Sequence, residues 1–190
     1  INEFNKIIDG KNAVAQNAFY HLADSYIKLD QKQQALNAFK SASEIDFSLE
    51  IKEDAWFNYA KLSYQIGNSY QSAPEVLLSF MEAFPNNENN SELKDLLIDS
   101  YITSKNYQSA LDLLENNKSF KNKLAYQKVT FFRGLELYSE GNYQEGIKIF
   151  NKSLSEPRDA SFTARATFWK AECDYQLSNF EQSLIGYKQF

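Results

Sequence analysis

Apolar and polar residues alternate along this chain with the period of an α-helix. The segment GNYQEGIKIF, residues 141–150, begins with a Gly-Asn pair that ends one helix and caps the next, and apolar residues then recur at helical spacing. A glycine inside a helix costs about 1 kcal/mol relative to alanine, so Gly146 needs a packing reason. The whole chain has only six glycines and three prolines, too few for the turns of a β-rich fold. The pattern predicts an all-α protein.

The same pattern returns along the chain as an internal repeat. KNYQSALDLL from Lys105, GNYQEGIKIF from Gly141 and SNFEQSLIGY from Ser178 align without gaps, and DQKQQALNAF from Asp30 fits the same alignment. A small residue occupies one place in all four segments: Ala35, Ala110, Gly146 and Ser183, with Ala73 in a looser match. This self-similarity predicts a series of helical hairpins.

Each hairpin also has a first helix with a matching small residue. Twelve or thirteen positions before the small residue of the second helix stand Ala23, Ala60, Gly134 and Ala171, with Ile98 as the exception. Facing small residues allow two antiparallel helices to approach toward the low end of the usual interaxial distance of about 8–10 Å. We therefore expect Gly134 to face Gly146 at the closest crossing in the chain.

These motifs resemble the tetratricopeptide repeat family of bacterial arrays. In FYHLADSY, residues 19–26, the first-helix places of the family's W-x2-L-G-x2-Y pattern are filled, and Ala35 and Phe39 fill the A-x3-F places of the second helix. The family's corner glycine is replaced in three units by Asp30, Lys105 and Ser178. The resemblance implies a right-handed superhelical α-solenoid of antiparallel helix-turn-helix repeats.

The resemblance covers the chain as one array over residues 1–190. Residues 1–10 match the end of a preceding repeat, and the chain stops inside an apparent helix, so we expect both ends to be cut from a longer protein. The last repeat would then be truncated, with apolar residues left for self-association through this end. The five expected repeats are 16–49, 53–86, 90–120, 124–157 and 162–190.

One connection is expected to differ from the others. Pro74 cannot lie deep in a helix, but SAPE from Ser72 reads as a capping box in which Glu75 reaches back to the cap and Pro74 falls in the first turn. The helix should therefore begin late, after a longer connection. The most loop-like segment follows it, and a hinge or proteolytic site would lie at residues 86–90.

Charge and composition narrow the classes of partner. Twenty basic and 25 acidic residues give a net charge of −5, which argues against a nucleic-acid partner. No run of 18 apolar residues is present, so no membrane span is expected in this fragment. The single cysteine, Cys173, fits either redox environment, and the location stays open between the periplasm or cell envelope and the cytoplasm.

The sequence offers little material for catalysis. His21 is the only histidine, it lies beside core positions of a helix, and Cys173 is about 150 residues away, which argues against a nucleophilic dyad. The same scarcity of histidine and cysteine argues against a metal site, and the phosphate-loop pattern is absent. We therefore expect a protein that is not an enzyme and needs no cofactor.

The family resemblance also implies a binding surface. Tetratricopeptide proteins turn one side of their first helices toward a concave groove, where tyrosine and phenylalanine make good interface anchors. Glu92, Asp95 and Asp99 share one helix face, which is either solvated or an acidic patch for a basic partner. The implied groove residues are Tyr20, Asp24, Lys28, Phe57, Lys61, Tyr64, Asp95, Asp99, Phe131, Tyr138, Phe168, Glu172 and Tyr175.

The sequence therefore favours a non-catalytic scaffold that binds a partner peptide or helix in this aromatic-lined groove. Inter-repeat packing is an equal alternative for each aromatic residue. Two other functions remain open: an α-helical carbohydrate-active enzyme that uses paired carboxylates, and a component of a bacterial cell-envelope assembly complex.

Overall fold

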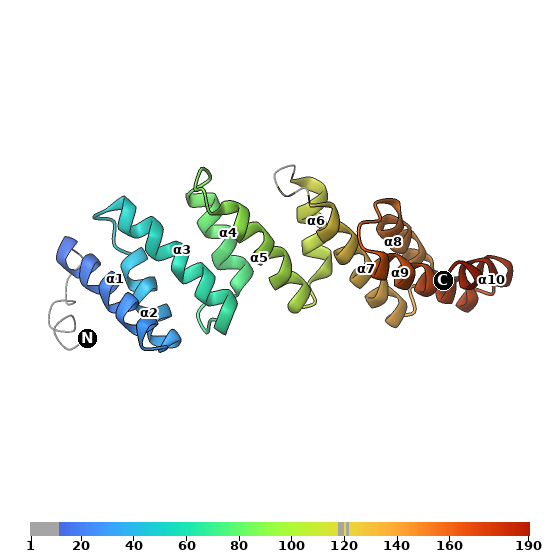
Figure 1. The fold of residues 1–190 in the computed structure, drawn as a ribbon, viewed down its shortest axis with the longest axis horizontal. Helices are drawn as coiled ribbons and strands as arrows, with labels where there is room; N and C mark the ends of the chain where they lie inside the picture. The colour runs from blue at the N-terminus through green and yellow to red at the C-terminus, as the bar shows by residue number, and fades with distance from the viewer. Residues whose placement is uncertain (1–11, 118–119, 121) are drawn as a thin grey trace. The chain divides into compact units, whose positions relative to one another are not determined.

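The computed structural model describes residues 12–117, 120 and 122–190, and this part of the chain is helical without any β-strand (Figure 1). The all-α helical repeat fold predicted from the sequence is confirmed. Residues 1–10, expected to be the end of a preceding repeat, lie outside the described residues. The helices are α1 (Ala13–Lys28), α2 (Lys32–Ser43), α3 (Leu49–Ile66), α4 (Ala73–Ala83), α5 (Asn90–Thr103), α6 (Tyr107–Asn116), α7 (Lys123–Ser139), α8 (Tyr143–Ser155), α9 (Ala160–Gln176) and α10 (Phe180–Gln189).

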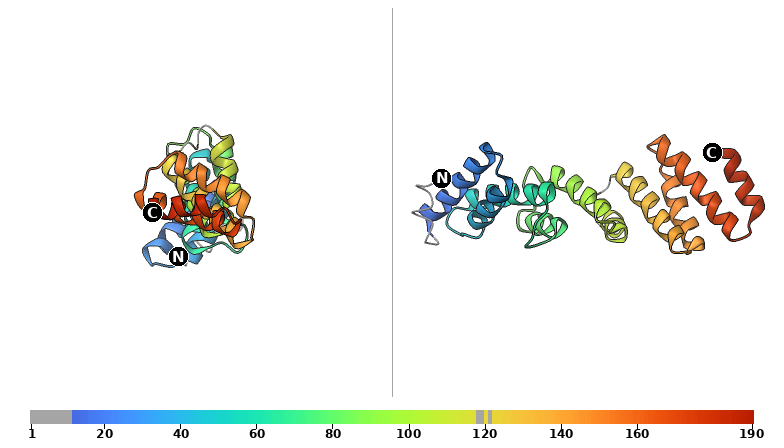
Figure 2. Two further views of the ribbon diagram at one scale, coloured as in Figure 1. Left: turned by 90° about the vertical axis from the view of Figure 1, so that its right-hand side faces the viewer. Right: turned by 90° about the horizontal axis from the view of Figure 1, so that it is seen from below.

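The chain divides into two compact units, residues 1–100 and 101–190, with the division inside α5. Figure 2 shows the helices from two further sides. In unit 1, α1 packs against α2 and α3 packs against α4, and α3 also contacts both helices of the first pair. In unit 2, α7/α8 and α9/α10 form the equivalent pairs, and α9 contacts both α7 and α8. Each predicted repeat range overlaps two consecutive helices, although α1, α3, α7 and α9 begin before their ranges do, and the repeat boundaries themselves remain a prediction.

The first helix of a pair begins at a side-chain cap in four cases. Asn12 accepts a hydrogen bond from the Ala15 amide at 2.9 Å, and Asn122 accepts one from the Ala125 amide at 3.0 Å. Ser48 and Asp159 serve α3 and α9 in the same way. These side chains satisfy amide groups that have no partner within the helix, and they fix where each repeat starts.

The corners between paired helices share one backbone conformation. Residues 29–31, 104–106, 140–142 and 177–179 form these corners, and the middle residue is left-handed in each. Its φ is 55° at Asp30, 58° at Lys105, 63° at Ser178 and 77° at Gly141. The three departures from the family's corner glycine therefore keep the backbone of a glycine and bear a cost that glycine avoids.

This cost can be measured at Lys105 and Ser178. We expect Lys105→Gly and Ser178→Gly each to raise the free energy of unfolding by up to about 1 kcal/mol, because glycine adopts the left-handed conformation without a steric penalty. Gly141→Ser is the reverse control and should lose a similar amount, since a side chain there has open space but an unfavourable φ. Urea unfolding of the three variants measures these changes. A Gly141→Ser protein more stable than the wild type would contradict the predicted cost of a side chain at a left-handed corner.

The corner between α3 and α4 differs, as predicted. Residues 67–72 replace the three-residue corner, and α4 begins after Ser72. The Ser72 amide donates to the Glu75 carboxylate at 2.9 Å, and Pro74 lies in the first turn. The capping box read from the sequence is therefore confirmed, and it explains why this connection is longer than the others.

The glycine pair of unit 2 lies at a close helix crossing. A Cβ atom built on Gly146 would stand 3.8 Å from the Gly134 carbonyl oxygen but only 3.2 Å from the Cys173 sulfur of α9. A Cβ atom on Gly134 would stand 2.5 Å from the ring of Phe150, which is fully buried. The two glycines do face each other, but the closest neighbours that exclude a side chain are Phe150 and Cys173. This corrects the sequence-based explanation.

Candidate protein-binding surfaces

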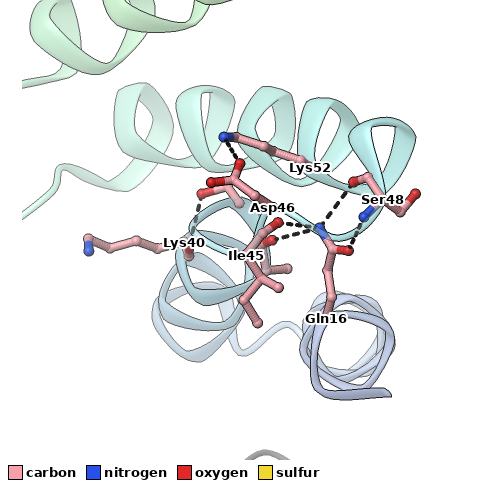
Figure 3. A network of polar contacts seen from close by, with 8 residues as sticks. Gln16, Lys40, Ile45, Asp46, Ser48 and Lys52 are labelled. Atoms are coloured by element: carbon pink, nitrogen blue, oxygen red, sulfur yellow. Dashed lines mark hydrogen bonds and ion pairs between the residues drawn. The ribbon is translucent and has the colours of Figure 1, made fainter. Parts of the chain in front are cut away.

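Two first helices, α1 and α7, each carry a fully buried glutamine that hydrogen-bonds to the connection following the helix pair. Gln16 of α1 donates to the carbonyl oxygens of Ile45 at 2.6 Å and Ser48 at 3.1 Å, and its amide oxygen accepts from the Ser48 amide at 2.8 Å (Figure 3). These bonds hold the segment that leads into α3. The neighbouring first helices α1 and α3 are therefore fixed side by side.

Gln127 of α7 plays the same part in unit 2. Its amide nitrogen donates to Thr163 at 2.9 Å, and its oxygen accepts from the amides of Arg158 and Asp159 at 2.9 and 2.8 Å. Glu53 occupies the corresponding place on α3 and accepts a 2.7 Å bond from Asn87. Sequence analysis missed this position because glutamine and glutamate usually mark a solvated helix face. Its signal was available: each of these residues stands seven places before the small residue of its first helix.

The expected groove residues of unit 1, which we call the unit 1 row, lie on α1, α3 and α5. Tyr20 is half-buried, its hydroxyl donates to Asp54 of α3, and its ring packs edge-on against Phe39 at 5.9 Å. Burial and the adjacent Asp54 carboxylate raise the pKa of Tyr20. Asp24 is half-buried and Lys28 is exposed on the same helix. Tyr20 thus links two neighbouring first helices while part of it remains accessible.

On α3 the row continues with Phe57, Lys61 and Tyr64, all of which are half-buried. The Lys61 ammonium lies 5.1 Å from the centre of the Phe57 ring and 2.8 Å from the Glu92 carboxylate of α5. Asp95 is exposed and Asp99 half-buried farther along α5. Glu92 is therefore engaged in an ion pair with α3, so the acidic face of α5 is partly neutralised.

In unit 2 one predicted groove residue belongs to the core. Phe131 is fully buried between the rings of Phe150 and Phe162, and the Arg165 guanidinium covers it at 4.5 Å. The sequence prediction that Phe131 lines an accessible groove was wrong. Phe131 instead packs between repeats, which is the alternative left open for each aromatic residue.

The other unit 2 residues, which we call the unit 2 row, keep some exposure. Tyr138 of α7 is half-buried, with its ring 4.9 Å from that of Trp169 on α9. Phe168 is half-buried, and Glu172 accepts a 2.5 Å hydrogen bond from the Tyr187 hydroxyl of α10. Tyr175 is 52% exposed. Tyr175 is therefore the most accessible aromatic residue of the unit 2 row.

The last helix also exposes apolar side chains. On α10 and at its end, Phe180, Leu184, Ile185 and Phe190 are 59%, 54%, 52% and 65% exposed. This is the surface from which self-association was predicted, and self-association stays a prediction.

The single cysteine and the single histidine of the chain lie in different settings. Cys173 is fully buried, and burial raises the pKa of its thiol to about 12, so the thiol stays protonated at neutral pH. His21 is exposed, with its ring 5.6 Å from that of Tyr20. Within the described part of the chain, no group of three or more His, Cys, Asp or Glu residues is arranged to hold a metal ion. Nor does any described helix have the length and apolar character needed to cross a membrane.

Paired helices with small residues at their crossings and left-handed corners define a helical-hairpin repeat protein. The family model of the tetratricopeptide repeat matches residues 16–48, which are therefore a tetratricopeptide repeat. The chain as a whole has the fold of a tetratricopeptide repeat protein.

Solved structures with this fold cover most of the chain. MamA of AMB-1 has 19% identity and a TM-score of 0.54, with 92% of this chain and 89% of that chain covered. YrrB, described as a tetratricopeptide repeat protein with an unusual peptide-binding site, has 18% identity and a TM-score of 0.51, with 96% and 88% covered. No curated protein sequence matches this chain significantly.

Proposed function

We propose that this protein is a non-catalytic scaffold that binds protein or peptide partners along its first helices. The carrying observation is that neighbouring first helices pack against each other within each unit, α1 with α3 and α7 with α9, and present half-exposed aromatic rings beside charged groups. Such rings bury a large area at low cost in side-chain entropy, which makes them effective anchors.

The chemistry of the two rows suits an extended peptide or an amphipathic helix. Tyr20, Phe57 and Tyr64 offer apolar area in unit 1, and Asp24 and Lys61 can orient polar groups of the partner. The peptide-binding site named for YrrB, which shares the fold, lends support by analogy. The protonated Cys173 thiol supports a role without nucleophilic catalysis.

Partner capture by a double tyrosine variant tests this proposal. The wild-type protein is expected to capture partner proteins from native lysate. We expect the double variant Tyr64→Ala/Tyr175→Ala to lose this capture, since both residues are partly exposed and available to a partner. Phe47→Ala is the matched control, because Phe47 is 67% exposed in a connection outside both rows. Quantitative mass spectrometry of the retained proteins provides the measurement.

Thermal unfolding of the same variants separates binding from packing. Truncation of a buried aromatic residue to alanine costs about 3–5 kcal/mol, whereas a residue that serves binding should change the melting temperature little. Unchanged capture by a well-folded double variant would rule out the rows as the binding surface. A large fall in melting temperature would assign the two tyrosines to the core.

A further inference from the structure

A hollow lies in unit 1, on another side of α3 from the unit 1 row. It has a volume of about 530 Å³ and is formed by the end of α2, the first half of α3 and the long connection 67–72. Three aromatic rings and two lysines dominate its wall. The lining residues are Lys40, Ser43, Glu44, Lys52, Trp56, Tyr59, Tyr70 and Gln71.

The hollow and the unit 1 row are separate surfaces of the same helix. Lys52, Trp56 and Tyr59 recur at i, i+4 and i+7 along α3, and the row residues 57, 61 and 64 follow the same spacing. At 3.6 residues per turn the two sets lie about 140° apart around the helix axis. A ligand in the hollow would therefore leave the unit 1 row free.

Both ammonium groups of the hollow lie over aromatic rings. Lys40 stands 5.3 Å from the centre of the Tyr70 ring, and Lys52 stands 5.9 Å from that of Trp56. Their side chains are only 27% and 23% exposed, whereas their carboxylate partners Glu44 and Asp46 are 58% and 79% exposed. The positive groups thus belong to the wall, and the negative groups extend toward solvent.

A polar network holds the α2–α3 side of the hollow in place. Gln16 binds Ile45 and Ser48, and the segment between them carries Asp46, which pairs with Lys52 (Figure 3). Since the connection cannot shift without breaking bonds to a buried amide, the backbone at Asp46 keeps its place beside α3 before any ligand arrives.

A second polar network holds the side formed by the long connection. Asn68 donates to the Tyr59 hydroxyl and to Ser63, both at 2.8 Å, and its oxygen accepts from the Tyr70 amide at 2.9 Å. These bonds hold the Tyr59 hydroxyl and tie the backbone of Tyr70 to α3. The backbone on both sides of the hollow is therefore held in place by side-chain hydrogen bonds.

We propose that this hollow binds a peptide segment that presents an acidic side chain next to an aromatic one. The carboxylate would lie between the Lys40 and Lys52 ammonium groups, where it can replace the exposed Glu44 and Asp46 as their partner. The aromatic side chain would pack on Trp56 and Tyr70, since Tyr70 is 59% exposed whereas Tyr59 is buried. The lining carries two positive charges and one negative charge, and Asp46 balances the second lysine from outside the lining, so an anion is favoured where it displaces these exposed carboxylates.

Titration of the full chain followed by amide NMR shifts tests the proposal. The probe is the peptide acetyl-Gly-Phe-Glu-Gly-amide, and acetyl-Gly-Phe-Gln-Gly-amide is its uncharged counterpart. We expect shifts confined to residues 40–46, 52–59 and 67–71, and binding at least about tenfold tighter for the glutamate peptide. That preference should shrink at high salt, because it is electrostatic.

Matched lysine variants complete the experiment. Lys40→Gln with Lys52→Gln should abolish the preference for the glutamate peptide, while Lys32→Gln, at an exposed lysine of α2 outside both the hollow and the unit 1 row, should keep it. Equal affinity for the two peptides, no binding up to about 10 mM, or shifts at Phe57, Lys61 and Tyr64 instead would overturn the proposal. Each of these results leaves the lysate test of the two rows unaffected.

Discussion

Gly134→Ala is expected to destabilise the protein even though alanine is the better helix former. The added Cβ atom would stand 2.5 Å from the Phe150 ring, and that ring is enclosed by the buried cluster of Phe131, Ala166 and Cys173. Overpacking of this kind costs about 1–3 kcal/mol, while the gain in helix propensity returns at most about 1 kcal/mol. Thermal and urea unfolding would measure the loss, at about 2–4 °C per kcal/mol for a chain of this size.

A smaller partner should relieve the clash. We expect Phe150→Leu to cost less in the Gly134→Ala protein than in the wild type, since the shorter side chain gives the new methyl group space. The double-mutant cycle isolates this coupling, which should lie within about 0.5–3 kcal/mol. Gly146→Ala is the milder comparison, because its Cβ atom would meet the Cys173 sulfur at 3.2 Å. Additive effects of Gly134→Ala and Phe150→Leu would show that the close approach does not limit the packing.

Local features of this fold could be predicted because they depend on neighbouring residues. The capping box at Ser72 and the late start of α4 both follow from short-range backbone chemistry. The repeat pattern supplied the helix pairs, since small residues recur where helices cross. Sequence spacing placed the helix pairs but not every contact within them, since a Cβ atom on Gly134 would lie closest to the ring of Phe150 and not to Gly146.

Contacts between hairpins were harder to foresee. Phe131 and Tyr138 lie on the same helix, α7, and nothing in the local sequence distinguishes them. Phe131 is nevertheless buried against α8 and α9, whereas Tyr138 is half-exposed. The burial of Gln16 and Gln127 depends on carbonyl and amide groups roughly 30 residues away, in a connection whose path the sequence does not show. The hollow beside Trp56 likewise needs the long connection 67–72 to fold back on α3. These features arise from tertiary packing.

Gln16→Glu is expected to cause a large, pH-dependent loss of stability. The substituted carboxylate cannot donate, and it would face the carbonyl oxygens of Ile45 and Ser48 at a fully buried site. An uncompensated buried charge costs about 3–5 kcal/mol. Gln33→Glu, at an exposed position of α2, adds the same charge without burial and should cost less than about 0.5 kcal/mol.

The pH dependence follows from the same geometry. Burial beside two carbonyl oxygens raises the pKa of the substituted carboxyl in the folded state above its unfolded value of about 4.3. The folded variant therefore binds the extra proton more readily, so its stability relative to wild type should recover as the pH falls through that raised pKa. The protonated carboxyl can again donate to Ile45. A deficit that stays constant from neutral to mildly acidic pH, as Gln33→Glu should show, would mean that Gln16 acts through packing and not through its hydrogen bonds.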